Sequence, residues 1–143
     1  MRLYFLLTAG IAILIAVGLL NILAFQYYWY WLIWWFDLLM HTLGGLGLGL
    51  VLLGLGELNL KLLDKNGFWR LALSVMVIVM LISVAWEFFE FTTDHAHHNY
   101  LIVKTPLLLQ QGARDTASDL LSDLFGVLLA IEIVNLTLWP KQA

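Results

Sequence analysis

The sequence contains no cysteine and few charged residues. The absence of cysteine excludes disulfides, thiolate metal ligands and thiol nucleophiles, and it leaves the redox compartment unreadable. Only 12% of the 143 residues are Asp, Glu, Lys or Arg, against about a quarter in an ordinary soluble domain. The basic residues are scattered and the net charge is −3, so no nucleic-acid partner is expected.

Apolar residues take the place of the missing charges. They make up 62% of the chain, and the mean hydropathy is +0.90. Such a chain could not cover a water-facing surface without leaving large exposed apolar patches. The seven Trp and five Tyr suit the aromatic belts at membrane interfaces. We therefore expect a protein embedded in membrane lipid.

Four stretches are long enough to cross a bilayer, whose core of about 30 Å needs about 20 apolar helical residues. The runs are continuous and lack a period of two, which favours helices over a barrel. The first run could be a signal peptide, but it is longer than a usual signal core and no small-x-small cleavage site follows it. The expected fold class is all-α, with residues 1–143 forming one transmembrane domain. Its four transmembrane helices are predicted at residues 3–25, 37–56, 69–91 and 116–138.

The connections between these helices differ in character. Residues 26–36 form an uncharged aromatic strip suited to a membrane interface, and residues 57–68 form a short polar turn. Residues 92–115 begin with a cluster of three histidines at 94–98, which we interpret as a solvated loop. The apolar stretch that follows, up to Leu109, is too short to span a bilayer. We expect it to form an interfacial segment between the third and fourth helices.

The basic residues predict an orientation in the membrane. With four spans, both termini and the middle connection share one side. That side holds most of the Lys and Arg residues, whereas the other side holds only Lys104 and Arg114. The positive-inside rule therefore predicts a multi-pass protein of the inner (plasma) membrane with both termini in the cytoplasm.

Acidic residues and one histidine converge at the opposite, outer face of the predicted bundle. They lie at the start of the second span, at the end of the third and at the start of the fourth. Because consecutive helices alternate in direction, all of them fall at one face, and reversing the topology would move them together. The set comprises Asp37, His41, Glu87, Glu90, Asp115, Asp119 and Asp123.

The spacing within this set indicates a metal site. Intervals of three and four residues place the members from each helix on one helical face. At 1.5 Å per residue, Asp123 lies about 12 Å deeper than Asp115, and an ionised group at such depth costs at least about 2.5 kcal/mol unless it has a partner. Fixed cations are scarce at this face, so we expect a divalent ion (Zn, Mn or Fe), for which imidazole and carboxylate are ordinary ligands. The predicted metal ligands are Asp37, His41, Glu87, Asp115 and Asp123, and the predicted catalytic acid–base residues are Glu90 and Asp119.

Each of these residues also has a purely structural interpretation. Thr116 and Asp119 fit a capping box, with Asp115 placed favourably at the positive end of its helix. Asp37 could likewise cap the second helix, with His41 bonded to a backbone carbonyl. Capping explains the residues singly, but it does not explain why three helices deliver acids to the same face.

Glycines are concentrated in the second predicted span. They include the pair Gly45-x-x-x-Gly49, and small residues let helices approach closely in lipid. We interpret them as packing residues, which would also hold the neighbouring His41 rigidly.

Three blocks of sequence together resemble the YjdF-like family of bacterial inner-membrane proteins, which is distantly similar to the VanZ-like proteins associated with glycopeptide resistance. The blocks lie in the second, third and fourth spans. The resemblance implies that the seven residues named above act as one constellation, but it implies no reaction. The blocks are Trp35-Phe36-Asp37 with His41 and Gly44-Gly45; Trp86-Glu87 with Glu90; and Gln111-Gly112 with Asp115-Thr116, Asp119, Asp123 and Gly126.

Three functions fit this pattern. The first is a metal-dependent hydrolase or transferase acting on a membrane lipid or lipid-linked headgroup. The second is binding or transport of a cation or proton without chemistry. The third is an accessory subunit of a larger membrane complex. The expected partners are membrane lipid and either further copies of this chain or the other subunits of such a complex. No nucleophile elbow is evident, which disfavours covalent acyl chemistry, and no haem is expected because His41 is the only histidine within a span.

Overall fold

The computed structural model describes residues 2–60, 65–100 and 112–138. All regular structure in these ranges is helical, as the sequence predicts. The expected interfacial segment between the third and fourth transmembrane helices lies mainly in 101–111, outside the described residues. The helices are α1 (Arg2–Tyr27), α2 (Trp29–Leu32), α3 (Phe36–Leu60), α4 (Lys65–Tyr100) and α5 (Ala113–Leu138).

Four of these helices have the length and apolar character of membrane spans, which confirms the expected fold class. The spans are Tyr4–Tyr27, Phe36–Gly56, Asn66–Thr93 and Ala113–Leu138. Each contains nearly all of the corresponding predicted helix. The largest shifts from the predicted bounds are three residues each, at the start of the span in α4 and at the start of the span in α5.

The histidine-rich segment at 94–98 was predicted as a loop, and that prediction was wrong for the backbone. Helix α4 continues to Tyr100 and has 36 residues, which at 1.5 Å per residue makes it about 54 Å long. The apolar span within it ends at Thr93. The last turns of α4 therefore extend past the membrane-spanning part as helix.

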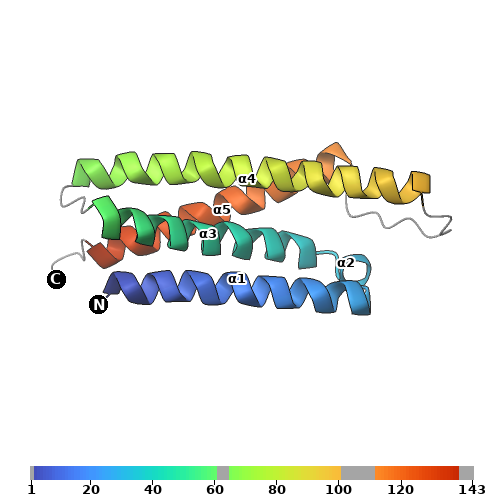
Figure 1. The fold of residues 1–143 in the computed structure, drawn as a ribbon, viewed down its shortest axis with the longest axis horizontal. Coiled ribbons are helices and arrows are strands. Elements are labelled where there is room, and N and C mark those ends of the chain that lie inside the picture. Colours follow the sequence, from blue (N-terminus) through green and yellow to red (C-terminus); the bar gives the residue numbers. More distant parts are fainter. Residues whose placement is uncertain (1, 61–64, 101–111, 139–143) are drawn as a thin grey trace.

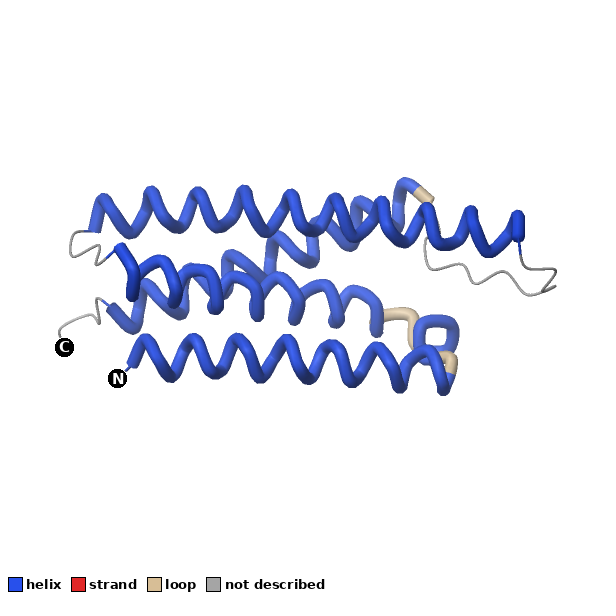
Figure 2. The backbone as a smooth tube through the Cα atoms, viewed as in Figure 1, coloured by secondary structure: helices blue, strands red, loops and turns tan. Residues whose placement is uncertain are grey.

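Helix α3 occupies the middle of the bundle. It packs against α5 and α1 over most of its length and also contacts α4, which packs against α5. Figure 1 shows α3 lying between α1 and α4, with α5 crossing behind. The start of α1, the end of α3, the start of α4 and the end of α5 lie at the same end (Figures 1 and 2). Because the helices alternate in direction, the start of α3, the end of α4 and the start of α5 come together at the other end of the bundle.

Glycines allow α3 and α5 to touch along their backbones. A Cβ atom on Gly45 would overlap the backbone of Asp123, and one on Gly126 would overlap the backbone oxygen of Thr42. Further along, a Cβ on Gly49 would lie 2.6 Å from the Cβ of Ala130. Both backbone contacts lie within about one turn of His41 and Asp123, so this packing fixes how far apart those side chains lie.

The interior of the bundle divides into an apolar part and a polar part. The apolar core is built from all four long helices and includes Leu50, Phe68, Val79 and Val134. Every buried polar or charged side chain in the described residues lies nearer the other end, from Ser83 outward. Within the described residues, buried charge is therefore confined to that end, while the rest of the interior is apolar.

The aromatic strip closes the polar end of the bundle. Tyr28, in a left-handed conformation (φ 60°), separates α1 from the single-turn helix α2. The rings of Tyr30 and Trp29 then pack edge-on against Phe36, with centroids 5.1 and 5.5 Å away. Trp34 remains 84% exposed, as expected for an interfacial residue.

We expect Gly126→Ala to destabilise the bundle, because the added methyl group must push α5 away from the backbone of Thr42. Overpacking of this kind lowers the free energy of unfolding by about 1–3 kcal/mol. The measurement is unfolding in mixed micelles followed by circular dichroism. Gly18→Ala is the matched control, since a Cβ there meets no atom within 4 Å. Equal stability of the two variants would contradict the close-packing account.

Candidate functional site

The buried faces of three helices end in polar residues at the same place. On α4 the buried positions Val75, Val79 and Ser83 continue into Glu87 and Glu90 at helical spacing. On α5 the stripe that contains Val134 and Val127 ends in Asp123 and Asp119, and on α3 the corresponding position is His41. The five polar side chains of this carboxylate–histidine cluster are between 1% and 8% exposed: His41, Glu87, Glu90, Asp119 and Asp123.

His41 is the centre of the cluster. Its Nδ1 atom lies 2.9 Å from Oδ2 of Asp123, a hydrogen bond between α3 and α5. Its Nε2 atom lies 3.6 Å from Oδ1 of Asp37 and 3.9 Å from Oε1 of Glu87. One imidazole therefore faces carboxylates from three helices. Its Nδ1 atom bonds to a carboxylate, and not to a backbone carbonyl as the structural interpretation proposed.

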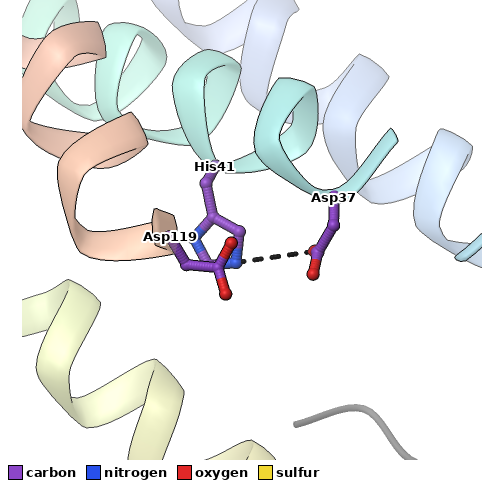
Figure 3. A group of neighbouring side chains, drawn as sticks. All are labelled: Asp37, His41 and Asp119. Atoms are coloured by element: carbon purple, nitrogen blue, oxygen red, sulfur yellow. Dashed lines mark ion pairs between the residues drawn. The ribbon is translucent and has the colours of Figure 1, made fainter. Parts of the chain in front are cut away.

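Among the acidic residues whose burial the structure describes, Asp119 is the most deeply buried, at 1% exposure. It belongs to a group with Asp37 and His41 whose ligand atoms all lie within 4.8 Å of one another, and Figure 3 shows its carboxyl group beside the imidazole ring. Neither of its oxygens accepts a hydrogen bond from the described part of the chain. A buried carboxylate without a donor is costly, so this position favours either a bound cation or a bound proton.

The two glutamates of α4 complete a second group around the same histidine. His41, Glu87 and Glu90 have ligand atoms within 4.8 Å of one another. Glu90 Oε1 accepts a 2.9 Å hydrogen bond from Nε1 of Trp86, one turn earlier on α4. Trp86 thereby orients Glu90 toward the interior rather than toward the headgroups.

The capping interpretation does not fit α5. The helix begins at Ala113, and the backbone N–H of Thr116 donates to the carbonyl of Gly112 over 3.2 Å. Thr116 therefore lies inside the first turn, and Asp119 lies beyond that turn. Asp115 does belong to the first turn, where a negative charge suits the helix dipole, and it belongs to neither potential ligand group in the described residues.

Two hollows meet at the cluster. A cavity of about 320 Å³ runs between α1, α3 and α4 and is lined by apolar residues and by polar side chains that include Asp37, His41, Glu90 and Asp123. A wider cleft of about 550 Å³ lies on the outer side, between α2, the start of α3 and the start of α5. Its polar residues include Arg114, Asp115 and Asp119, and Tyr30 and Asp37 line both hollows. The cluster is thus reachable from both.

Tyr30 stands at the junction of the two hollows. Burial, together with the negative charges of Asp37, Glu90 and Asp119, raises the pKa of its phenol above the ordinary value. The hydroxyl is therefore protonated at neutral pH, and it donates a hydrogen bond to Oδ1 of Asn21 on α1. This bond ties α2 to α1 beside the cavity.

The donor set of the cluster fits a divalent cation. Two ligands that each lie about 2.1 Å from a tetrahedral ion are roughly 3.4 Å apart, close to the 3.6 Å between His41 Nε2 and Asp37 Oδ1. The Asp123–His41 contact has the form of the carboxylate–histidine pairs that orient metal-bound imidazoles. A buried His/Asp/Glu group in this protein could therefore hold a metal ion.

The family model of predicted membrane proteins designated DUF2238 matches residues 1–139, nearly the whole chain. The chain belongs to the DUF2238 family. This membership confirms the expectation of a membrane protein family, while the resemblance to YjdF-like and VanZ-like proteins stays a prediction. No curated protein and no solved structure matches this DUF2238 member significantly.

The structure brings together six of the seven predicted site residues in this DUF2238 member and places the seventh, Asp115, one turn outward on the rim of the cleft. Sequence reasoning did not assign a site role to Trp86, Tyr30 or Asn21. A signal for two of them existed, since Trp86 lies four residues before Glu90 and Asn21 is the strongly polar residue of its span.

We expect His41 and Asp123 to be energetically coupled, because each satisfies the other in an apolar setting. A double-mutant cycle with His41→Ala and Asp123→Ala should give an interaction free energy of about 0.5–3 kcal/mol. Glu132→Ala, an exposed residue on the same helix, provides the control and should be additive with His41→Ala. Additivity in both cycles would show that the bond contributes nothing to stability.

Proposed function

We propose that this protein is a metal-dependent membrane hydrolase or transferase that acts on a lipid or lipid-linked phosphoryl or acyl group. The observation that carries the proposal is the buried Asp119 carboxylate, which has no hydrogen-bond donor in the described residues although it lies beside His41. A cation between these side chains would supply the positive charge that they lack. Zn, Mn and Fe all accept such ligands.

The geometry supports a division of roles that differs from the one predicted from spacing. His41 Nε2, Asp37 and Asp119 are the ligands that we propose for the ion, with Glu87 within reach as a further one. Asp123 bonds to the other ring nitrogen, so we assign it as a positioning residue that fixes the tautomer of His41. We do not assign Asp115 as a ligand, because it lies on the rim of the outer cleft and belongs to neither ligand group in the described residues.

Glu90 is our candidate general base. The Trp86 bond holds one of its oxygens, and the other would accept the proton of the attacking water or alcohol. A divalent ion held by His41, Asp37 and Asp119 would supply Lewis acidity toward the attacking water and the phosphoryl or acyl oxygen. In hydrolysis the water oxygen bonds to phosphorus or carbon, the ester bond breaks, and the leaving oxygen receives the proton from Glu90.

The apolar core weighs against a transport function. Beyond Ser83, the buried side chains of the described helices are apolar as far as the opposite end, so no chain of polar groups continues across the bundle. Transport would need a second copy or another subunit to provide a path. Cation binding without chemistry, or a role as an accessory subunit, would still be compatible with the cluster.

We further propose that the cluster faces the outside of the inner membrane and that both termini are cytoplasmic. The start of α1 and the end of α5 lie at one end of the bundle (Figure 1), and most Lys and Arg residues flank that end in the sequence. A substrate in the outer leaflet would then reach the cleft directly.

We expect the purified protein to contain close to one divalent ion per chain, measured by elemental analysis after gel filtration. Asp119→Asn removes a proposed ligand without changing its size, so the ion should be lost. Asp123→Asn should weaken binding by about 10–100-fold, the usual effect of removing a residue that orients a ligand. Glu132→Gln, an exposed carboxylate on the same helix, should change nothing.

Circular dichroism of each variant separates loss of the ion from loss of the fold. A wild-type protein that is folded but free of metal would refute the proposal and favour an accessory role. A protein that holds metal but turns over no lipid phosphate or acyl ester would favour cation binding without chemistry.

The absence of cysteine makes the orientation directly testable. Ala113→Cys places a single exposed thiol at the cluster end, and Asn66→Cys places one at the other end. In intact cells, a membrane-impermeant maleimide should label Cys at 113 fully and label Cys at 66 only after permeabilisation. The reverse pattern would place the cluster on the cytoplasmic side.

A further inference from the structure

The cavity between α1 and α4 is elongated and has opposite character at its two ends. One end is formed by Leu14, Leu48 and Ile82, and the other contains Asp37 and Glu90. On α3 its lining extends from Asp37 to Leu48, which corresponds to about 16 Å along the helix. That length is about half of a 30 Å hydrocarbon core, the depth of one leaflet.

This cavity also opens sideways toward the bilayer. Within the described helices, α1 and α4 each pack against α3 but have almost no contact with each other, and Figure 1 shows α3 between them. Gly18 and Ile82, which line the cavity from α1 and α4, are both exposed. A Cβ on Gly18 would meet no atom within 4 Å, so this side of the cavity is open to a molecule in the membrane.

The outer cleft carries one positive charge, that of Arg114, among the carboxyl groups of Asp37, Asp115 and Asp119. Arg114 lines it together with Asp119 and Ser118, and Tyr30 and Asp37 line both the cleft and the cavity. An arginine at this position suits a phosphate group. The apolar, leaflet-deep cavity and the arginine-bearing cleft thus meet at the carboxylate–histidine cluster.

We infer that the substrate is a phosphate-bearing membrane lipid, with one acyl chain inserted between α1 and α4 and its headgroup in the cleft beside Arg114. That the bound lipid is a substrate rests on the proposed function. That its acyl chain binds in the protein rests on the cavity alone. The lipid would slide in from its own leaflet, so its hydrocarbon would not need to leave an apolar environment, and its headgroup phosphate would come to lie at the cluster.

Photolabelling tests this inference. The protein is reconstituted into vesicles that contain a phosphatidic acid carrying a diazirine on one acyl chain, irradiated and mapped by mass spectrometry. Insertion of the chain predicts adducts on Met40 and Leu48, which lie inside the cavity. The outward-facing Leu128, which is 47% exposed, should be labelled as by any surrounding lipid. Labelling confined to outward-facing residues would overturn the inference.

Two phenylalanine variants provide a matched pair. Gly18→Phe places a ring in the open side of the cavity and should reduce labelling of Leu48 by about tenfold. Ala16→Phe puts the same ring on an exposed position of α1 that does not line the cavity, and it should leave the labelling unchanged. If both variants lost labelling of Leu48 equally, the added ring would be disturbing the fold rather than filling the cavity. That result would contradict binding of an acyl chain in the cavity.

The headgroup is tested by a diacylglycerol probe that carries the same diazirine chain but no phosphate. The phosphatidic acid probe should label the cavity more strongly, and Arg114→Gln should abolish the preference, whereas Arg70→Gln at the other end should not. Equal labelling by the two probes would overturn the role assigned to the phosphate. Elemental analysis of the same samples separates the two proposals: metal without cavity labelling refutes only the lipid inference, and cavity labelling without metal refutes only the metal-dependent function.

Discussion

The burial of several carboxylates around one imidazole, within a part of the chain that crosses a membrane, is the constraint that organises this protein. Charged groups at such depth are stable only when they face the interior and share a counter-charge. His41 can neutralise at most one of the acids that surround it, and it already bonds to Asp123. The remaining negative charge must be met by protons or by a cation, and this requirement connects the fold to the proposed chemistry.

The rest of the bundle can be understood as support for that arrangement. Glycines bring the backbones of α3 and α5 into contact beside the cluster, so the His41–Asp123 distance is fixed by main-chain packing rather than by flexible side chains. The apolar core closes the opposite end of the interior. The aromatic residues of α2 cover the outer end and leave a cleft beside it. Rigid surroundings of this kind are what a metal-binding site requires if its ligands are to hold one geometry.

The two hollows approach the cluster from different sides. One hollow is apolar at the end away from the cluster, opens toward the bilayer and has the depth of about one leaflet. The other is polar and carries an arginine among three carboxyl groups. An amphipathic molecule can satisfy both at once, whereas a soluble metabolite would leave the apolar cavity unused. For the function that we propose, the bilayer would deliver the lipid to the cluster already oriented.

Composition and periodicity alone determined that this chain has four helices able to span a membrane and that six of its ten acids share one face with His41, because hydrophobic length and helix alternation are properties of the sequence. The sequence also predicted close packing at Gly45 and Gly49, although not its partner, Gly126. Only the tertiary structure decided that Asp123 bonds to Nδ1 of His41, that Asp119 stays without a hydrogen-bond donor in the described residues, and that Asp115 stands outside the cluster. The continuation of α4 past the span was likewise hidden, since a polar, histidine-rich segment is equally typical of a loop. These features depend on how each helix is rotated and how closely it approaches its neighbours, which are set by contacts between residues far apart in the chain.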